Sequence, residues 1–160
     1  MFVRPANIIE NMATLISRSS MISMFEKPKF KSFINGLSTS QRKELVNGLN
    51  QQLYGNQHQG FEAVLEQLKN AKLAKWSLIT GIPVYFHPHT DYFVKPTTTK
   101  NIIEFFELKQ VKYSPTPSWE FYANYRAILD EMKAKVDPSL APNNAAFTGM
   151  LMMALASHLS

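Results

Sequence analysis

The residues best suited to chemistry are His87, His89 and Asp91, which alternate along one short segment of the chain. In an extended strand, alternate side chains point to the same face, so these three would converge on one point. Two imidazoles and a carboxylate are ligands that zinc and similar ions accept. The spacing therefore predicts a candidate site for a divalent metal, and no other cofactor is expected. The other interpretation is a polar turn whose histidines bond locally or face water.

The six residues 87–92, which read HPHTDY, resemble the HxHxDH motif of the metallo-β-lactamase-type hydrolases. The resemblance implies that His87, His89 and Asp91 bind a catalytic zinc pair. Tyr92 stands where that motif has its last histidine, and a chain of 160 residues is short for that fold. A small metal-dependent enzyme centred on these residues is therefore an alternative function.

A basic stretch formed by Lys27, Lys29 and Lys31 is a second candidate site. Three phenylalanines lie near it in the sequence: Phe25, Phe30 and Phe33. Cations mixed with aromatic rings are typical of single-stranded nucleic-acid sites. Phe30 and Phe33, however, have the spacing of core contacts in a short helix, and no DNA- or RNA-binding signature accompanies them. Nucleic-acid binding is thus the second alternative, and nucleic acid is not the expected partner.

Aromatic residues crowd the start of a long helix predicted after the Pro-rich loop 113–118. Trp119 and Phe121 lie about 200° apart on a helix, so the aromatic side chains cannot all face one core. Aromatic residues are frequent at binding hot spots, and methionines adapt to varied partners. The other interpretation is that the rings hold the loop to the core. The predicted protein-binding residues are Trp119, Phe121, Tyr122, Met150 and Met153.

Signatures of catalysis are otherwise missing from the sequence. It has no cysteine, which excludes disulfides, thiolate catalysis and iron–sulfur ligation. It has no GxSxG elbow, P-loop, dinucleotide fingerprint or HExxH. The leading hypothesis is therefore a non-catalytic protein–protein interaction module, such as an adaptor, a chaperone-like factor or an inhibitor, that binds another protein or itself.

Composition fits a folded, basic protein. The chain is 45% hydrophobic and only 18% charged, with a net charge of +5. Residues 1–50 hold most of the excess, with seven Lys or Arg against three Glu. Such a surface suits an acidic protein, anionic lipid or nucleic acid, although dispersed cations are also an ordinary solvated surface.

Targeting signals are weak. No run is long enough to cross a membrane, and no signal-peptide pattern opens the chain. We therefore expect a cytoplasmic protein, with export by a signal-peptide-independent route as the alternative. The composition further suggests a bacterial origin, with a role as an effector or secretion-system accessory.

The periodicity predicts one mainly α domain over 1–160, a bundle of about six to seven helices with a short irregular β-hairpin near 82–95. Val84, Tyr85 and Phe86 favour a strand there, and prolines surround them. A helix is expected from residue 61 to about 76. The apolar run 102–108 fits a helix or a strand, and the three threonines at 97–99, which can cap a helix, favour the helix.

Two further helices carry specific expectations. Ser38 and Gln41 are placed to form a capping box at the start of a helix that contains Gly48, and this glycine requires either a close helix contact or a weak helix. Residues 145–159 contain no Asp, Glu, Lys or Arg. A helix without a charged face is either central to the core or covered by another chain.

Overall fold

The computed structural model describes the backbone of residues 5–20 and 22–159, and the side chains of residues 8–20 and 22–157. Within these residues there are eight α-helices, one short 3-10 helix and no strand. The helices are α1 (Pro5–Arg18), α2 (Glu26–Asn35), α3 (Thr39–Tyr54), α4 (Gln57–Asn70), α5 (Trp76–Phe86), α6 (Pro96–Phe105), α7 (Trp119–Lys133), η1 (Pro138–Leu140) and α8 (Asn144–Leu159). The prediction of a mainly α fold is confirmed, although the described residues form eight α-helices where about six to seven were expected.

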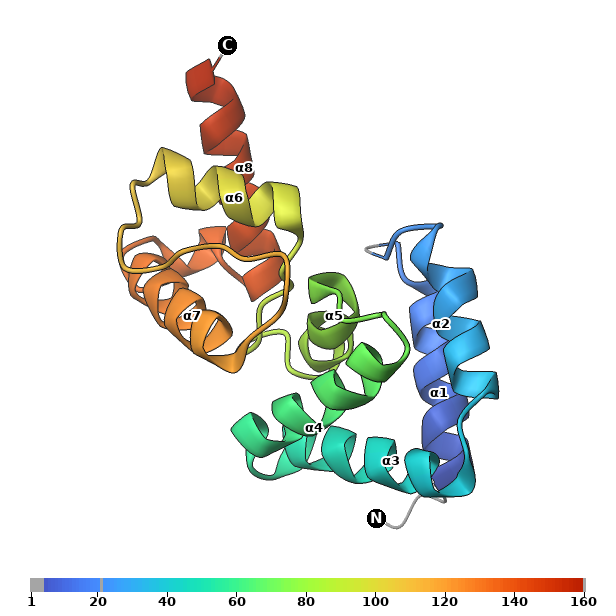
Figure 1. Ribbon diagram of the computed structural model, residues 1–160. Coiled ribbons are helices and arrows are strands. Elements are labelled where there is room, and N and C mark those ends of the chain that lie inside the picture. The colour runs from blue at the N-terminus through green and yellow to red at the C-terminus, as the bar shows by residue number, and fades with distance from the viewer. Residues whose placement is uncertain (1–4, 21, 160) are drawn as a thin grey trace.

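The helices are arranged around α5. Figure 1 shows α1 and α2 side by side at one end of the molecule, α3 and α4 joined as a helical hairpin, and α6, α7 and α8 gathered at the other end. Residues Leu78 to Val84 of α5 are all buried. None of the described helices is long and apolar enough to cross a bilayer.

The β-hairpin predicted near 82–95 is wrong. Residues 82–86 are the last part of α5, and residues 91–95 run extended without a partner strand. Side chains of neighbouring helices accept hydrogen bonds from the backbone of this segment. Tyr92 N donates to Tyr122 Oη at 3.2 Å, and Val94 N donates to Thr80 Oγ1 at 3.0 Å. Because these bonds replace a ladder, the segment needs no second strand.

Pro83 lies inside α5, where a proline normally weakens a helix. It has no N–H to give to the carbonyl four residues earlier, which belongs to Ile79. Gln52 of α3 replaces that donor, since its Nε2 lies 3.2 Å from Ile79 O and the amide is buried. A tertiary contact therefore permits a helix where local propensity favours a strand.

The helix predicted from residue 61 to about 76 is placed correctly but ends earlier, and residues 71–75 form a turn before α5 begins. α4 ends at Asn70, and Lys72 adopts a positive φ of 59°. Leu73 N then donates to Leu68 O at 2.8 Å, which completes a Schellman-type end. Lysine replaces the usual glycine there, so the sequence carries no signal for this boundary.

α6 is helical as predicted, but its expected cap is wrong. The helix begins at Pro96, and its N-cap is Lys95, whose side chain makes no capping bond. The threonines at 97–99 lie within the first turn. Proline at the first helical position accounts for the earlier start, because it loses no hydrogen bond there.

The start of α3 confirms the predicted capping box. Ser38 Oγ accepts from Gln41 N at 3.1 Å, and Gln41 Oε1 accepts from Ser38 N at 2.9 Å. The close contact expected at Gly48 is also present. A Cβ there would lie 2.9 Å from Ala63 Cβ, and one on Gly60 would collide with the backbone of Gln52. The two glycines let α3 and α4 approach backbone to backbone.

Candidate functional site

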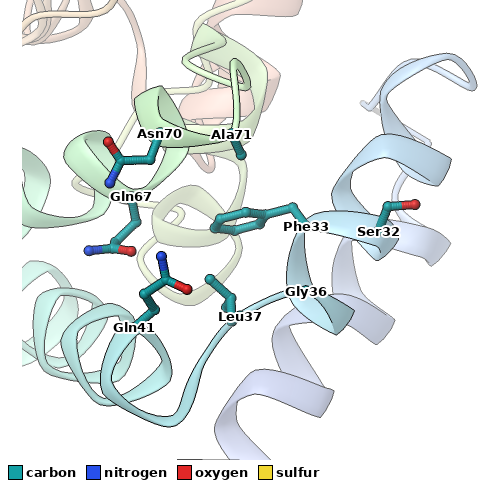
Figure 2. Close-up of a pocket in the computed structure, with 8 residues that line it drawn as sticks. All are labelled: Ser32, Phe33, Gly36, Leu37, Gln41, Gln67, Asn70 and Ala71. Carbon is teal, nitrogen blue, oxygen red and sulfur yellow. The ribbon is translucent and has the colours of Figure 1, made fainter.

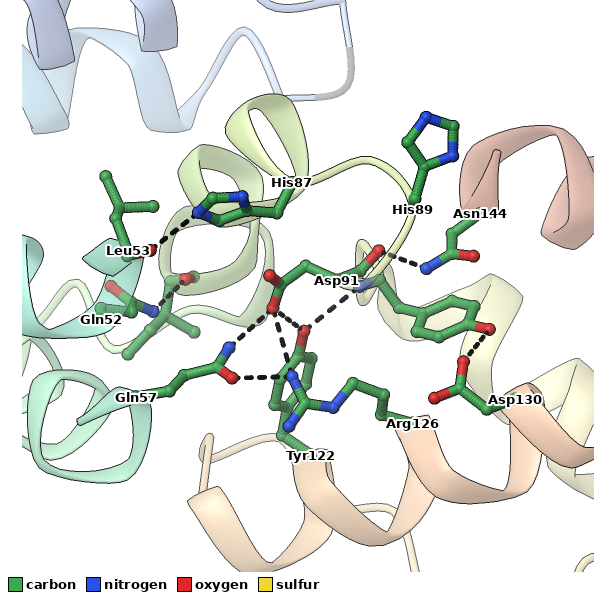
Figure 3. A network of polar contacts seen from close by, with 12 residues as sticks. Gln52, Leu53, Gln57, His87, His89, Asp91, Tyr122, Arg126, Asp130 and Asn144 are labelled. Atoms are coloured by element: carbon green, nitrogen blue, oxygen red, sulfur yellow. Dashed lines mark hydrogen bonds and ion pairs between the residues drawn. The ribbon is translucent and has the colours of Figure 1, made fainter. Parts of the chain in front are cut away.

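The three predicted metal ligands do not converge. His87 follows α5, and its Nε2 lies 2.8 Å from Leu53 O. His89 is exposed, whereas Asp91 is only 3% exposed. Figure 3 shows the two imidazoles directed away from the Asp91 carboxylate. No group of three His, Cys, Asp or Glu side chains suited to a metal ion occurs in the part of the chain that the structure describes. The strand expected to align them is replaced by a turn.

Asp91 instead anchors a polar network between α4 and α7. Its Oδ1 accepts from Tyr122 Oη at 2.5 Å and from Gln57 Nε2 at 2.7 Å, and it lies 3.5 Å from Arg126 Nη1. Arg126 Nη1 also donates to Gln57 Oε1 at 2.8 Å. Buried carboxylates are stable when they are paired and hydrogen-bonded in this way. These contacts, drawn in Figure 3, give Asp91 a structural role.

The network continues into α8. Asn144 Nδ2 donates to Asp91 O at 2.9 Å, and its backbone N donates to Pro88 O at 2.8 Å. Lys133 Nζ donates to Asn144 Oδ1 at 2.6 Å. The segment 87–95 is thereby fixed to the start of the last helix. Nothing in the local sequence around Asn144 marks it as buried, because an Asn at the start of a helix is typical of an exposed cap.

Two tyrosines of this region are held in their protonated state. Burial, followed by the Asp91 carboxylate, raises the pKa of Tyr122 far above its ordinary value. Burial raises the pKa of Tyr92 in the same direction, and Asp130 adds to the effect by accepting from Tyr92 Oη at 2.7 Å. Both hydroxyls are therefore donors at neutral pH, which suits positioning and not proton abstraction.

The aromatic row at the start of α7 is mostly internal. Phe121 and Tyr122 are 6% and 2% exposed, so these two predicted protein-binding residues lie in the core. Trp119 is half-buried and stacks on His58, with ring centroids 5.2 Å apart. The Arg126 guanidinium lies 5.5 Å from the Trp119 ring. The aromatic side chains thus hold α4 and α7 together, with Trp119 at the rim.

The last helix has one buried stripe and one open face. Three residues spaced by four pack into the core: Phe147, Leu151 and Leu155. Met150 is half-buried, and Met153 is 75% exposed. The opposite side is formed by Ala145, Gly149, Met153 and Ala156, all exposed, which we call the α8 face. Because α8 lies at the edge of the bundle beside α6 (Figure 1), it is not a central core helix.

The three lysines of the basic stretch lie on α2. Lys29 and Lys31 are exposed and Lys27 is half-buried. Phe30 and Phe33 are core residues, at 1% and 9% exposure. The structure therefore leaves no row of rings beside these lysines on which successive bases would stack.

A pocket of about 230 Å³ lies where α2, α3 and α4 meet. Figure 2 shows the amides of Gln41, Gln67 and Asn70 around it, with the Phe33 ring at its wall. Gln67 Oε1 is buried and has no hydrogen-bond partner among the described residues, while Gln67 Nε2 donates to Glu44 at 2.7 Å. The lining is uncharged, so its chemistry is limited to hydrogen bonding and apolar contact.

The chain was compared with known protein families, curated proteins and solved structures. No family model, curated protein or solved structure matches the chain.

Proposed function

We propose that the chain is a non-catalytic protein–protein interaction module that docks through the α8 face. The observation that supports this most directly is the contrast within one helix. Three residues of α8 anchor it to the bundle, and the opposite face is exposed and apolar. No Asp, Glu, Lys or Arg occurs anywhere in the helix. An exposed helix face normally carries charge, so an uncharged one favours burial against a partner.

The charges favour a second copy of this chain as the partner that binds the α8 face. Two molecules with a net charge of +5 repel each other, and the repulsion is weakest where neither surface carries a charge. The α8 face also brings a glycine and an exposed methionine one turn apart. A Cβ on Gly149 would meet nothing within 4 Å, so no side chain of this molecule covers the helix backbone there. In an antiparallel pair, Met153 of each copy would lie over Gly149 of the other.

The contacts of Asp91 indicate that its carboxylate serves to hold helices together and not to catalyse a reaction. Its carboxylate receives bonds from Tyr122 and Gln57 that join α7 to α4. A carboxylate that is used to hold two helices is poorly placed to accept a substrate proton. The interaction module is for this reason preferred to the enzyme centred on the histidines.

Sedimentation velocity over a range of protein concentrations tests the proposal. We expect a monomer–dimer equilibrium that Met153→Glu weakens at least about tenfold, because a carboxylate buried at the interface without a partner is costly. Leu140→Glu is the matched control. It places the same charge on a residue that is 52% exposed but lies outside the α8 face, and it should leave the equilibrium unchanged. A monomer at every concentration, or equal effects of the two substitutions, would contradict a second copy as the occupant.

A further inference from the structure

Met24 and Phe25 are the most exposed large apolar residues in the described part of the chain, at 78% and 84%. They lie in the turn between α1 and α2, directly before the first residue of α2. Exposing two large apolar side chains at one turn is unfavourable in water. Such a pair indicates a surface that is buried when the protein binds a partner or a membrane.

Residues 22–26, which carry these two side chains, are anchored to the rest of the molecule at Ile22. Ile22 is 4% exposed and packs against Gly81 of α5. Phe25 N donates to Ser23 Oγ at 3.1 Å, and Glu26 N donates to Ser23 O at 3.0 Å. Met24 and Phe25 are therefore exposed on a backbone that is joined to α2 and anchored at Ile22.

Cations surround this apolar tip. Arg18 ends α1 and is exposed, and the lysines at 27, 29 and 31 follow on α2. Between residues 18 and 31 the only carboxylate is that of Glu26, and it accepts a hydrogen bond from Ser77 Oγ of α5 at 2.6 Å. The tip therefore combines two exposed apolar side chains with neighbouring residues whose net charge is positive.

The depth of the cations fits a lipid headgroup layer. Since a helix rises 1.5 Å per residue, Lys29 lies about 6 Å and Lys31 about 9 Å along α2 from Phe25. A headgroup layer is on the order of 5 to 8 Å thick. If Phe25 enters the acyl boundary with α2 along the membrane normal, Lys29 lies at the depth of the phosphates and Lys31 just beyond the headgroup layer, within reach through its long side chain.

We propose that this tip, formed by Met24, Phe25 and the cations of α1 and α2, docks on an anionic lipid surface. Apolar residues that enter the interface, flanked by Lys and Arg, are the features that hold peripheral proteins on membranes. Single-stranded nucleic acid fits less well. Phe30 and Phe33 are buried, so the exposed ring of Phe25 stands without a second one from this group for a following base to stack on.

Co-sedimentation of the full chain with phosphatidylcholine vesicles, with and without phosphatidylserine, tests this proposal. We expect binding only when phosphatidylserine is present, and weaker binding at higher salt. Lys29→Gln with Lys31→Gln should weaken binding about 25-fold, at about fivefold for each cation. Met24→Ser with Phe25→Ser should weaken it about tenfold or more.

Two control pairs separate the tip from general effects. Lys109→Gln with Lys112→Gln removes the same charge from exposed positions outside this turn, and Tyr85→Ser with Leu140→Ser removes exposed apolar area elsewhere. Both should stay within about twofold of the parent. The proposal is overturned if phosphatidylserine has no effect or if the controls lose as much binding. A single-stranded oligonucleotide is tested in parallel. The proposal is also overturned if Lys29→Gln with Lys31→Gln weakens binding to the oligonucleotide and not to the vesicles.

The absence of cysteine from the chain permits a direct measure of insertion. An environment-sensitive fluorophore attached through Met24→Cys should shift to the blue on phosphatidylserine vesicles. The same label attached through Tyr54→Cys, at a residue that is 71% exposed, should not shift. Equal responses at the two positions would contradict insertion of the tip. None of these substitutions touches the α8 face, so the result is independent of self-association.

Discussion

The contact between α3 and α4 and the face of α8 both contain glycine within a helix, with opposite surroundings. At Gly60 an added Cβ would collide with the backbone of Gln52 and lie 2.6 Å from Gly48 O. At Gly149 it would meet nothing within 4 Å. Glycine lowers helix stability wherever it stands, but only at the α3–α4 contact does this structure show what is gained. At α8 the structure shows no such gain, and we propose that a second copy of the chain provides it.

Substitution of Gly60 by alanine should produce the largest effect. The methyl group would force α3 and α4 apart, and we expect a loss of about 3 kcal/mol in the free energy of unfolding. Urea denaturation followed by circular dichroism measures it. A loss below about 1 kcal/mol would show that the two helices separate easily and would remove the contrast with α8.

Substitution of Gln52 by leucine tests the same interior without changing its volume much. The Ile79 carbonyl would lose its side-chain donor in a buried site, which should lower the free energy of unfolding by about 2 kcal/mol. Asn50→Leu, at an exposed position of the same helix, is the control and should stay within about 0.5 kcal/mol. Equal effects would mean that Gln52 does not compensate for Pro83.

Alkaline pH should affect the half of the molecule built on α7. Burial raises the pKa of Tyr92 and Tyr122, and it raises that of Tyr125 to about 12. An unfolded tyrosine loses its proton near pH 10, so these groups leave stability unchanged below that value. Above it each lowers the free energy of unfolding by about 1.4 kcal/mol per pH unit, until its own folded pKa is reached.

Chemical denaturation at a series of alkaline pH values measures this slope. Tyr122→Phe should make the slope shallower, because one raised group is removed. Tyr54→Phe should not, since Tyr54 is 71% exposed. Equal slopes for the two variants would contradict a protonated Tyr122 in the folded state.

The smallest predicted effect has the opposite sign. Gly149→Ala fills open space and restores helix propensity, so it should raise the free energy of unfolding of the monomer by about 0.5 to 1 kcal/mol. The same denaturation experiment, at a concentration where the chain is monomeric, measures it. A loss of stability would mean that α8 packs more tightly within its own chain than its exposure indicates.

The sequence predicts the helices wherever the signal is local. The capping box of Ser38 and the apolar stripe of α7 are examples, since their evidence lies within a few residues. The errors occur where a distant partner decides. Val84, Tyr85 and Phe86 favour a strand, yet they continue a helix that an amide from α3 completes.

The candidate sites follow the same rule. The alternation of His87, His89 and Asp91 predicts convergence only if the segment is a strand. The segment is instead a turn, in which Asp91 N donates to His87 O at 2.9 Å. The lack of charge in α8 is visible in the sequence. Whether this helix lies in the centre of the bundle or at its surface, however, depends on how many other helices pack around it. Gln52 offered a weak signal, because it lies three residues after Leu49 on an otherwise apolar stripe.

The amide of Gln52 and the ring of Pro83 are two halves of one arrangement, although 27 residues separate Gln52 from the carbonyl that it serves. Each residue is unfavourable alone: a buried amide without that carbonyl lacks an acceptor, and the proline without the amide leaves the carbonyl bare. We therefore expect the two positions to change together as this sequence diverges. In a related sequence with a residue other than proline at position 83, the backbone N–H can bond to the Ile79 carbonyl, and an aliphatic side chain can stand at position 52. That paired substitution would be the evolutionary record of this contact.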